Sequence, residues 1–403
     1  MSSTNSGSAA VPSVPAEASS DAVLTVDNLT VDFPTPDGAV HAVRGVSYRL
    51  RPGEVLGIVG ESGSGKSVTS MAVMGLLPKT AKISGSVRFR DRELLGLADK
   101  QMQDVRGRNV AMIFQDPMTS LNPVYRVGHQ LAEAVLAHND MPKAQARKRA
   151  IELLEMVNIP QPDRRVDQYP HEFSGGMRQR VVIAVAMANN PDVIIADEPT
   201  TALDVTVQAQ VLDSLRAAQK ETGAAMVLIT HDLGVVAGQA DRVLVMYAGK
   251  PVEIGSVDDI YYRPRMPYTL GLLGSLPRLD KREASRLTPI QGSPPSLVNL
   301  PPGCPFTPRC PLAQDVCQTR EPDLEPVDAG QSGPLAHRAA CHFKDRVARH
   351  APSDLFDESS ADAELPVDFG SSAYDDEDIE PRRPEDVDVR SVNTDFGTED
   401  DRT

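Results

Sequence analysis

Residues 60–67 of this 403-residue chain read Gly-Glu-Ser-Gly-Ser-Gly-Lys-Ser, so that a lysine and a serine end a glycine-rich segment. An apolar run at residues 55–59 precedes the segment, and residues 68–77 follow it with helical spacing. Between a strand and a helix, this pattern is typical of a loop whose backbone N–H groups point inward at phosphate oxygens. We therefore predict a phosphate-binding loop; an ordinary Gly/Ser turn would match by chance in about one case in a hundred.

The predicted loop and the helix after it suggest how a nucleotide would be held. Lys66 would reach the β- and γ-phosphates, and the Ser67 hydroxyl would bind Mg²⁺. The positive end of the following helix would add to the attraction for phosphate. The residues expected to contact the nucleotide in this segment are Gly60, Ser62, Gly63, Gly65, Lys66, Ser67 and Val68.

Two acidic residues, Asp197 and Glu198, end a second apolar run at residues 193–196. Asp197 would hold Mg²⁺, directly or through water, and Glu198 could act as general base on an attacking water. Capping of the next element is the alternative role for this pair. His231 ends the next apolar run, residues 226–230, so parallel strands would bring it to the same carboxyl edge, where ligands bind. By position alone, a functional and a structural role for His231 are about equally expected.

A second glycine pair opens a helical segment. Ser174, Gly175 and Gly176 precede an apolar run with helical spacing. Backbone N–H groups at a helix N-terminus can bind an anion, and an ordinary N-cap followed by loop glycines is the alternative. Two anion sites in one chain make sense if the second completes the nucleotide site of another subunit.

All four cysteines lie between residues 304 and 341, at Cys304, Cys310, Cys317 and Cys341. They are too few for a disulfide scaffold, and thiols in the cytosol stay reduced. Their proximity indicates a metal site, with free cysteines as an alternative, although no tight C-x-x-C pair is present. The site is far in sequence from the phosphate loop, so we expect it to be structural and to contribute no group to nucleotide chemistry.

The wider pattern predicts an α/β domain. The apolar runs named above are short and separated by helical segments, which is typical of buried parallel strands. Residues 23–26 and 29–33 alternate apolar and polar side chains, as two half-buried strands would. Helical spacing between residues 130 and 157 indicates an inserted helical subdomain. We predict a disordered segment at 1–20, a nucleotide-binding domain at 21–275 with the helical subdomain at about 116–190, a Pro- and Cys-rich extension at 276–350, and a disordered acidic tail at 351–403.

Charge and hydropathy exclude several classes of protein. The net charge of −15 comes almost wholly from the predicted tail, because residues 21–350 hold 37 acidic and 37 basic side chains. A neutral body argues against bulk electrostatic binding to nucleic acid. Its apolar runs are shorter than the ~18–20 residues needed to span a bilayer. The first 20 residues have neither the charged nor the apolar part of a signal peptide, so we expect a cytosolic chain.

Taken together, these motifs resemble the ATPase subunits of ABC transporters. The phosphate loop, Gln115, the Ser174-Gly175-Gly176 signature, Asp197-Glu198, Ala202-Leu203-Asp204 and His231 stand in that family's order and spacing. The chain is most similar to the oligopeptide/dipeptide importers, in the segments 114–123, 171–173, 267–270 and 300–306. The resemblance covers residues 23–345 and implies a P-loop NTPase fold with an ABC-type nucleotide-binding domain.

The resemblance also implies roles. Gln115 would contact Mg²⁺ and sense the γ-phosphate, and His231 would stabilise the transition state. Ser174, Gly175 and Gly176 would bind the γ-phosphate held by a partner subunit, and Asp204 would lie across the dimer interface. The four cysteines would hold a [4Fe–4S] cluster, with Zn²⁺ as the alternative. The usual Leu and Gln of the signature are Phe173 and Met177 here. Phe33 and His41 are both candidates to stack on adenine.

The implied function is ATP hydrolysis that powers peptide uptake, at the cytoplasmic face of the membrane. The implied partners are a second, related but different ATPase chain, two transmembrane permease subunits and, indirectly, an extracytoplasmic substrate-binding protein, without nucleic acid. Import of another solute, such as a nickel complex or glutathione, is an alternative, because selectivity lies outside such subunits. A soluble DNA-repair ATPase is a weaker one, since no coiled-coil insertion or basic surface is present.

Overall fold

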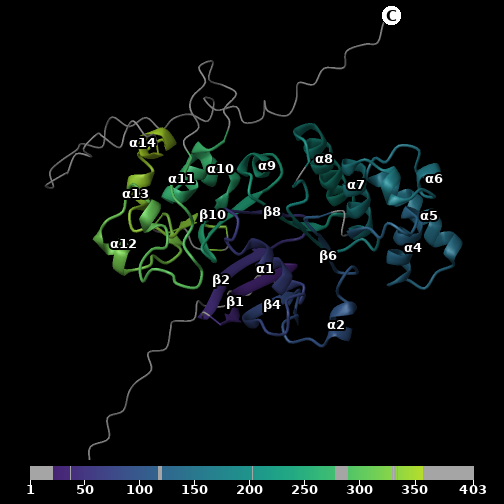
Figure 1. Cartoon of the computed structure of the whole chain (residues 1–403), viewed down its shortest axis with the longest axis horizontal. Coiled ribbons are helices and arrows are strands. Elements are labelled where there is room, and N and C mark those ends of the chain that lie inside the picture. Colours follow the sequence, from purple (N-terminus) through teal and green to yellow (C-terminus); the bar gives the residue numbers. More distant parts are fainter. Residues whose placement is uncertain are drawn as a thin grey trace, which may run out of the picture.

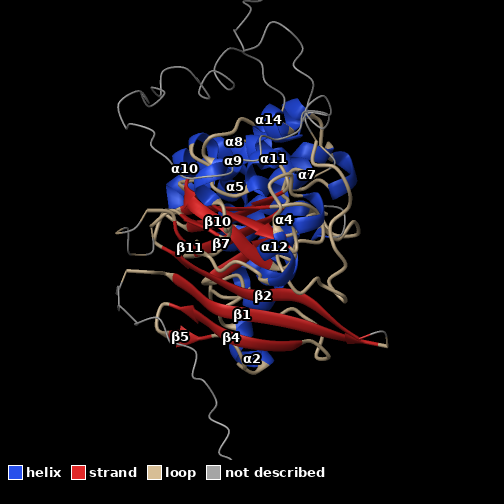
Figure 2. Ribbon diagram, turned by 90° about the vertical axis from the view of Figure 1, so that its left-hand side faces the viewer, coloured by secondary structure: helices blue, strands red, loops and turns tan. Residues whose placement is uncertain are grey.

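The computed structural model describes residues 21–356, apart from residues 37, 117–119, 202, 277–288, 329, 331–332 and 334. The predicted disordered lead-in at 1–20 lies outside the described residues. Two β-sheets with surrounding helices make up the described part (Figure 1). Figure 2 shows the smaller sheet as a separate layer beside the larger one, which carries most of the helices.

The larger sheet contains the strands that position the predicted site. Its spatial order is β11 (Glu325–Pro326), β12 (Arg338–Ala339), β10 (Lys250–Ser256), β9 (Arg242–Tyr247), β3 (Val55–Val59), β8 (Ala225–Thr230), β7 (Val193–Asp197) and β6 (Val110–Ile113). The strands from β9 to β6 pair in parallel, so the parallel strands predicted at the three apolar runs are confirmed. These strands are mainly apolar because both faces of the sheet are covered, and their polar residues stand at strand ends.

The burial of β7 shows how the chain fills both faces. Ile194 and Ala196 pack into a core with the helical block, whereas Val193 and Ile195 pack into a second core with the smaller sheet. Successive side chains of a strand point to opposite faces, so one short apolar run contributes to two cores. The carboxyl ends of these strands carry the two residues predicted there: Asp197 is the last residue of β7, and His231 directly follows β8.

The smaller sheet is antiparallel and has the order β2 (Gly38–Leu50), β1 (Leu24–Thr35), β4 (Lys82–Phe89) and β5 (Arg92–Glu93). The two strands predicted at 23–26 and 29–33 are one strand, β1, and that prediction of a break was wrong. Asn28 adopts a positive φ of 46° and the register shifts around it, so a bulge interrupts the apolar alternation without ending the strand.

The helices divide into a block between β6 and β7 and a set that follows the remaining strands. Figure 1 shows the block at one end of the molecule and the C-terminal helices at the other. The first half of the chain and the block contain α1 (Lys66–Val73), α2 (Asp99–Gln103), α4 (Val127–Leu136), α5 (Lys143–Met156), α6 (Pro162–Arg165), the 3₁₀ helix η1 (Pro170–Glu172) and α7 (Gly175–Ala186). The helical segment predicted at 130–157 is two helices, with Pro142 as the N-cap of the second.

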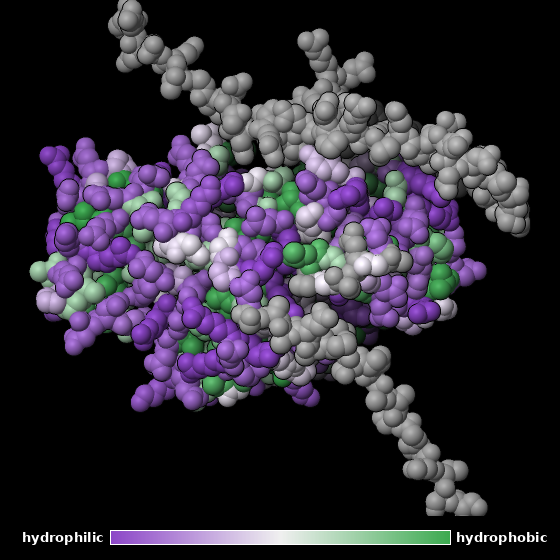
Figure 3. Space-filling view, turned by 180° about the vertical axis from the view of Figure 1, so that it is seen from behind, coloured by the Kyte–Doolittle hydropathy of each residue, from purple (hydrophilic) through white to green (hydrophobic). Residues whose placement is uncertain are grey.

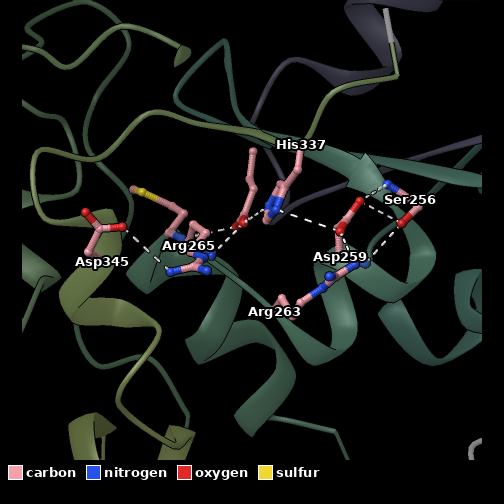
Figure 4. A network of polar contacts seen from close by, with 8 residues as sticks. Ser256, Asp259, Arg263, Arg265, His337 and Asp345 are labelled. Carbon is pink, nitrogen blue, oxygen red and sulfur yellow. Dashed lines mark hydrogen bonds and ion pairs between the residues drawn. The ribbon is translucent and has the colours of Figure 1, made fainter. Parts of the chain in front are cut away.

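The second half of the chain contains α8 (Val205–Thr222), α9 (Leu233–Ala237), α10 (Val257–Tyr262), α11 (Pro267–Gly274), the 3₁₀ helix η2 (Thr307–Arg309), α12 (Asp315–Thr319), α13 (Lys344–Val347) and α14 (Pro352–Phe356). A third core joins β9, β10 and α11 to the extension, with Tyr268 and Phe306 fully buried in it. In the described part of the chain, every helix is too short or too polar to span a lipid bilayer. Figure 3 shows a largely hydrophilic face with scattered apolar patches.

The structure corrects the predicted start of the acidic tail. Residues 352–356 form α14, which packs beside α11, and its Leu355 and Phe356 are only 8% and 9% exposed. Because Phe356 contributes to the third core, the boundary predicted at residue 351 falls too early. The acidic stretch from residue 357 onward lies outside the described residues.

This boundary gives a truncation test. Removal of residues 357–403 should leave the free energy of unfolding and the ATPase rate unchanged, because that stretch is rich in Asp and Glu and poor in apolar side chains. Removal from residue 351 should destabilise the protein, since each buried large side chain contributes roughly 1.5–3 kcal/mol. Urea unfolding of both truncated proteins measures the difference. A large loss of stability in the shorter truncation would show that the acidic stretch docks on the body.

Candidate active site

The predicted phosphate loop connects β3 to α1, as the motif requires. Gly60, Gly63 and Gly65 all adopt positive φ, at 153°, 78° and 97°. A Cβ atom at Gly60 would lie 2.3 Å from the Met246 carbonyl oxygen, and one at Gly65 would lie 2.4 Å from the Ala42 carbonyl oxygen. Only glycine allows this curl of the backbone.

Lys66 lies inside the curl of the loop. Its Nζ donates hydrogen bonds to the carbonyl oxygens of Gly60 (2.7 Å) and Glu61 (3.0 Å). The side chain is buried, and this burial lowers the pKa of the Lys66 ammonium. The loop therefore holds one positive charge at its centre, the place where phosphate oxygens would gather.

The two residues predicted to bind Mg²⁺ lie together. Ser67 Oγ donates a hydrogen bond to Asp197 Oδ1 at 3.0 Å, across 130 residues of sequence. Asp197 is 4% exposed, and burial raises the pKa of its carboxyl group. A hydroxyl beside a buried carboxylate is an oxygen donor set of the kind that Mg²⁺ prefers. These residues therefore fit the expected ion.

Glu198 stands at the centre of a cluster of polar side chains. Its carboxylate accepts hydrogen bonds from Gln115 Nε2 (3.1 Å) and Thr201 Oγ1 (2.9 Å), and lies 3.4 Å from His231 Nδ1 and 4.0 Å from Lys66 Nζ. The Glu198 backbone has a positive φ of 46°, a strained conformation that often marks a functional position. The structure thus brings together four residues that the sequence named. Thr201 was missed, although its position three residues after Glu198 permits this local contact.

A cavity of about 800 Å³ joins the phosphate loop, Gln115, Glu198 and His231. This volume is typical of a small-molecule site. Apolar residues in its lining include Phe33, Val40, Ala42, Leu272 and Leu297. Of the two candidates for adenine stacking, Phe33 lines the cavity, while the His41 ring bonds to Asp32 Oδ1 at 2.7 Å. Sequence reasoning missed Leu272 and Leu297, because nothing local marks a residue that reaches the cavity from the far end of the chain.

The signature residues do not line this cavity. Ser174 caps α7 by accepting a hydrogen bond from Met177 N, and both Ser174 and Gly175 are exposed. Gly176 packs so closely on α8 that an added Cβ would lie 2.3 Å from Val207 Cγ1. Asp204, also exposed, caps α8 through Val207 N at 3.0 Å. Ser174 is therefore the N-cap of α7, as the alternative predicted, and the N-terminus of this helix is exposed at the surface.

The four cysteines converge on one small cavity, of about 20 Å³, which is also lined by Phe306 and Phe343. Burial raises the pKa of Cys310 and of Cys341 to about 12, and that of Cys304 above its ordinary value. The Cys317 carbonyl oxygen accepts hydrogen bonds from Cys304 N (2.8 Å) and Thr307 Oγ1 (2.9 Å). Within the described ranges, no group of three or more His, Cys, Asp or Glu side chains is arranged to hold a single metal ion.

The cysteine-rich extension reaches the nucleotide site through residues other than its cysteines. Leu297 lines the nucleotide cavity. Arg309, which lies between two of the cysteines, forms an ion pair with Glu61 of the phosphate loop. The third core packs the extension against β9, next to the phosphate loop.

Comparison with known proteins agrees with this geometry. The family model described as ABC transporter matches residues 43–201, and the one described as oligopeptide/dipeptide transporter, C-terminal region, matches residues 252–317. Among solved structures, the dimeric ABC transporter cassette MJ0796 superposes with a TM-score of 0.52 and 28% identity, over 58% of this chain and 98% of that one. The cbiO1 protein of Clostridium perfringens, part of the ABC transporter complex cbiONQ, gives 0.53 and 28%, over 62% and 95%.

Sequence relatives are closer. The dipeptide transport ATP-binding protein DppD of Bacillus subtilis is 54% identical over 82% of this chain and 97% of its own length. The oligopeptide transport ATP-binding protein OppD of Escherichia coli is 52% identical over 78% and 93%. OppD of Mycobacterium tuberculosis is 57% identical over 83% of this chain, which spans only 54% of that longer relative. The chain therefore belongs to the ATP-binding proteins of ABC transporters, in their oligopeptide/dipeptide branch.

Proposed function

We propose that this chain hydrolyses ATP to power the uptake of di- or oligopeptides, as a peripheral subunit on the cytoplasmic face of the membrane. The observation that carries the proposal is the Glu198 carboxylate, held beside Lys66, Gln115 and His231 at a cavity of nucleotide size. The substrate class is supported by relatives that are named oligopeptide or dipeptide transport ATP-binding proteins.

In the proposed mechanism, the loop N–H groups and Lys66 bind the β- and γ-phosphates. Mg²⁺, held by Ser67, Asp197 and Gln115, would neutralise charge that develops on the phosphates. Glu198 orients a water molecule on the γ-phosphorus and accepts its proton as the bond to the β–γ bridging oxygen breaks. His231, 60% exposed beside that carboxylate, donates to the γ-phosphate.

The site is proposed to be completed by a second ATPase chain. Ser174, Gly175 and Asp204 are exposed on one side of the molecule, and Val205 beside Asp204 is 82% exposed. An exposed helix N-terminus attracts phosphate, so these residues would face the γ-phosphate bound by the partner. A related but different chain is our preferred partner.

Two permease subunits are the proposed membrane partners, with the substrate-binding protein acting through them. Phe114, Val124 and Tyr125 are 42%, 73% and 49% exposed, and they flank the segment after Gln115 and the start of α4. Large apolar side chains on the surface are typical of interaction sites. A docked permease would therefore lie close to Gln115, which touches Glu198. The proposed division keeps the nucleotide-binding domain at 21–275, with a helical subdomain at about 116–190. The extension predicted at 276–350 is lengthened to include α14, up to residue 356.

A transport assay tests the function. In a strain that lacks this subunit, expression of the chain with its permease should restore uptake of labelled di- and oligopeptides. The same panel of transport assays includes nickel complexes and glutathione, the cargoes of the alternative importers. Restored uptake of one of these solutes, without peptides, would move the assignment to that importer class. Co-purification with DNA in place of membranes would contradict a role in transport.

We propose further that Cys304, Cys310, Cys317 and Cys341 hold a [4Fe–4S] cluster, with Zn²⁺ as the alternative. Four thiols around one cavity support this proposal. A cluster takes one thiolate on each iron, so its ligands need not approach a single ion. When bound, it would supply folding energy to a proline-rich region.

The metal content gives a direct measurement. Protein purified without oxygen should be brown, with about four irons per chain and broad visible absorption. Colourless protein with one zinc per chain would favour the alternative. Metal-free protein with four titratable thiols and an ordered extension would contradict both.

A further inference from the structure

An ion pair joins the C-terminal extension to the phosphate loop. Arg309 Nη1 donates to Glu61 Oε2 at 2.7 Å, and Arg309 Nη2 donates to Glu61 Oε1 at 2.8 Å. Glu61 is the second residue of the loop, 248 residues away in sequence. Two parallel hydrogen bonds between a guanidinium and a carboxylate fix both distance and orientation.

Arg309 is built into the protein and does not reach out from the surface. Its side chain is 3% exposed, and its Nε donates to the Gln291 carbonyl oxygen at 3.0 Å. The guanidinium lies against the rings of Tyr247 and Phe306, at 6.0 and 5.9 Å from their centroids. Its backbone belongs to η2, the turn between Cys304 and Cys310. Because the guanidinium is held on several sides, it fixes the position of the Glu61 carboxylate.

Glu61 connects this constraint to Lys66, the lysine of the phosphate loop. Its backbone N–H donates to Tyr268 Oη at 2.8 Å, and its carbonyl oxygen accepts from Lys66 Nζ at 3.0 Å. Tyr268 is fully buried in the third core. Glu61 is thus held by its side chain and its N–H, and it holds Lys66 through its carbonyl.

Charge gives Arg309 a second effect. Glu61 is among the residues that line the nucleotide cavity, and its side chain is 28% exposed, so a negative charge lies near the space where a triphosphate would bind. Like charges at short distance repel strongly where the surroundings are partly buried. The Arg309 guanidinium neutralises this carboxylate without entering the cavity.

We propose that Arg309 is a positioning residue for the phosphate loop, which fixes and neutralises Glu61 so that the loop and Lys66 are ready to bind ATP. The inference rests on the proposed ATPase function. It makes the cysteine-rich extension part of the nucleotide-binding apparatus, although Arg309 itself does not line the nucleotide cavity.

Substitutions at both ends of the pair test the proposal. Arg309→Met should raise the Kd for ATP on the order of 10-fold, within the usual range for coupling between sites. The kcat at saturating ATP should change much less than KM, because Glu198 and His231 are not moved. Arg309→Lys should lie between, since it keeps the charge but loses the paired geometry. Adding Glu61→Gln to Arg309→Met should recover the part of the affinity that the unpaired carboxylate removes, whereas the part that depends on the fixed position of the loop stays lost.

A matched control separates positioning from simple attachment of the extension. Glu321 also ties the extension to the body, by accepting from Arg44 Nη2 and Lys250 Nζ, each at 2.8 Å. Glu321→Gln should therefore lower Tm while leaving the Kd for ATP unchanged. An equal loss of ATP affinity in Glu321→Gln and Arg309→Met would overturn the inference. It would also be overturned if Arg309→Met left the Kd for ATP unchanged in an assay in which Lys66→Ala weakens ATP binding. Failure of the unmodified protein to bind ATP would overturn the proposed function, and this inference with it.

The coupling between the ATP site and the extension acts in both directions, so it can also be measured in the unmodified protein. If Arg309 links the extension to the loop, ATP must stabilise the extension by the same coupling. Hydrogen exchange of residues 304–310 in the full chain should therefore slow when ATP binds. Unchanged exchange in that turn, together with slowed exchange in the phosphate loop, would contradict the link.

Discussion

Replacing Glu198 by glutamine is expected to slow ATP hydrolysis by about 10²–10⁴-fold, the usual contribution of a general base. The amide keeps the size of the carboxylate and can still contact Gln115 and Thr201, but it cannot accept a proton from water. ATP binding should persist, so an ATP-loaded dimer should accumulate. Single-turnover hydrolysis and size-exclusion chromatography with ATP measure the two effects.

The same substitution at an exposed carboxylate on α5, Glu155→Gln, is the matched control and should leave the rate unchanged. Near-normal turnover in Glu198→Gln would remove Glu198 from the catalytic role. His231 would then be the next candidate, because its ring lies beside the same carboxylate.

The second large effect is expected from Lys66→Ala. This change should weaken ATP binding itself by roughly 10- to 100-fold, since hydrogen bonds to charged groups contribute about 1.5–3 kcal/mol. The loss appears in Kd because the ammonium contacts phosphates in the ground state as well as in the transition state. Titration with a fluorescent ATP analogue measures it, and the exposed Lys79→Ala is the control.

The pKa of Lys66 adds a pH dependence with a definite sign. Burial lowers this pKa, and only the protonated form attracts phosphate. ATP affinity should therefore fall as the pH rises through the lowered pKa, and the Lys66→Ala protein should lack this fall. A Kd that stays flat at alkaline pH in the unmodified protein would contradict the placement of Lys66 at the phosphates.

Much of the nucleotide site was predictable because its signals are local. The phosphate loop is a contiguous segment whose glycines are dictated by backbone conformation, as the clashes at Gly60 and Gly65 show. Asp197 and His231 were predictable for a related reason. Short apolar runs identify buried parallel strands, and the carboxyl ends of such strands meet at one edge of the sheet. The bulge at Asn28 interrupts the apolar alternation, so the sequence pattern divided one strand into two. The break before Pro142 was missed because helical spacing resumes after it.

The sequence by itself therefore determined the fold class, the phosphate loop, the acidic pair and the edge of the sheet at which the functional residues lie. Only the tertiary structure decided that Leu297 lines the cavity, that Phe356 belongs to a core and that Arg309 forms an ion pair with Glu61. The physical reason is that a backbone motif or a strand end is specified by neighbours in sequence. An ion pair across 248 residues instead depends on how the third core folds the extension back onto the loop, and no local pattern carries that information.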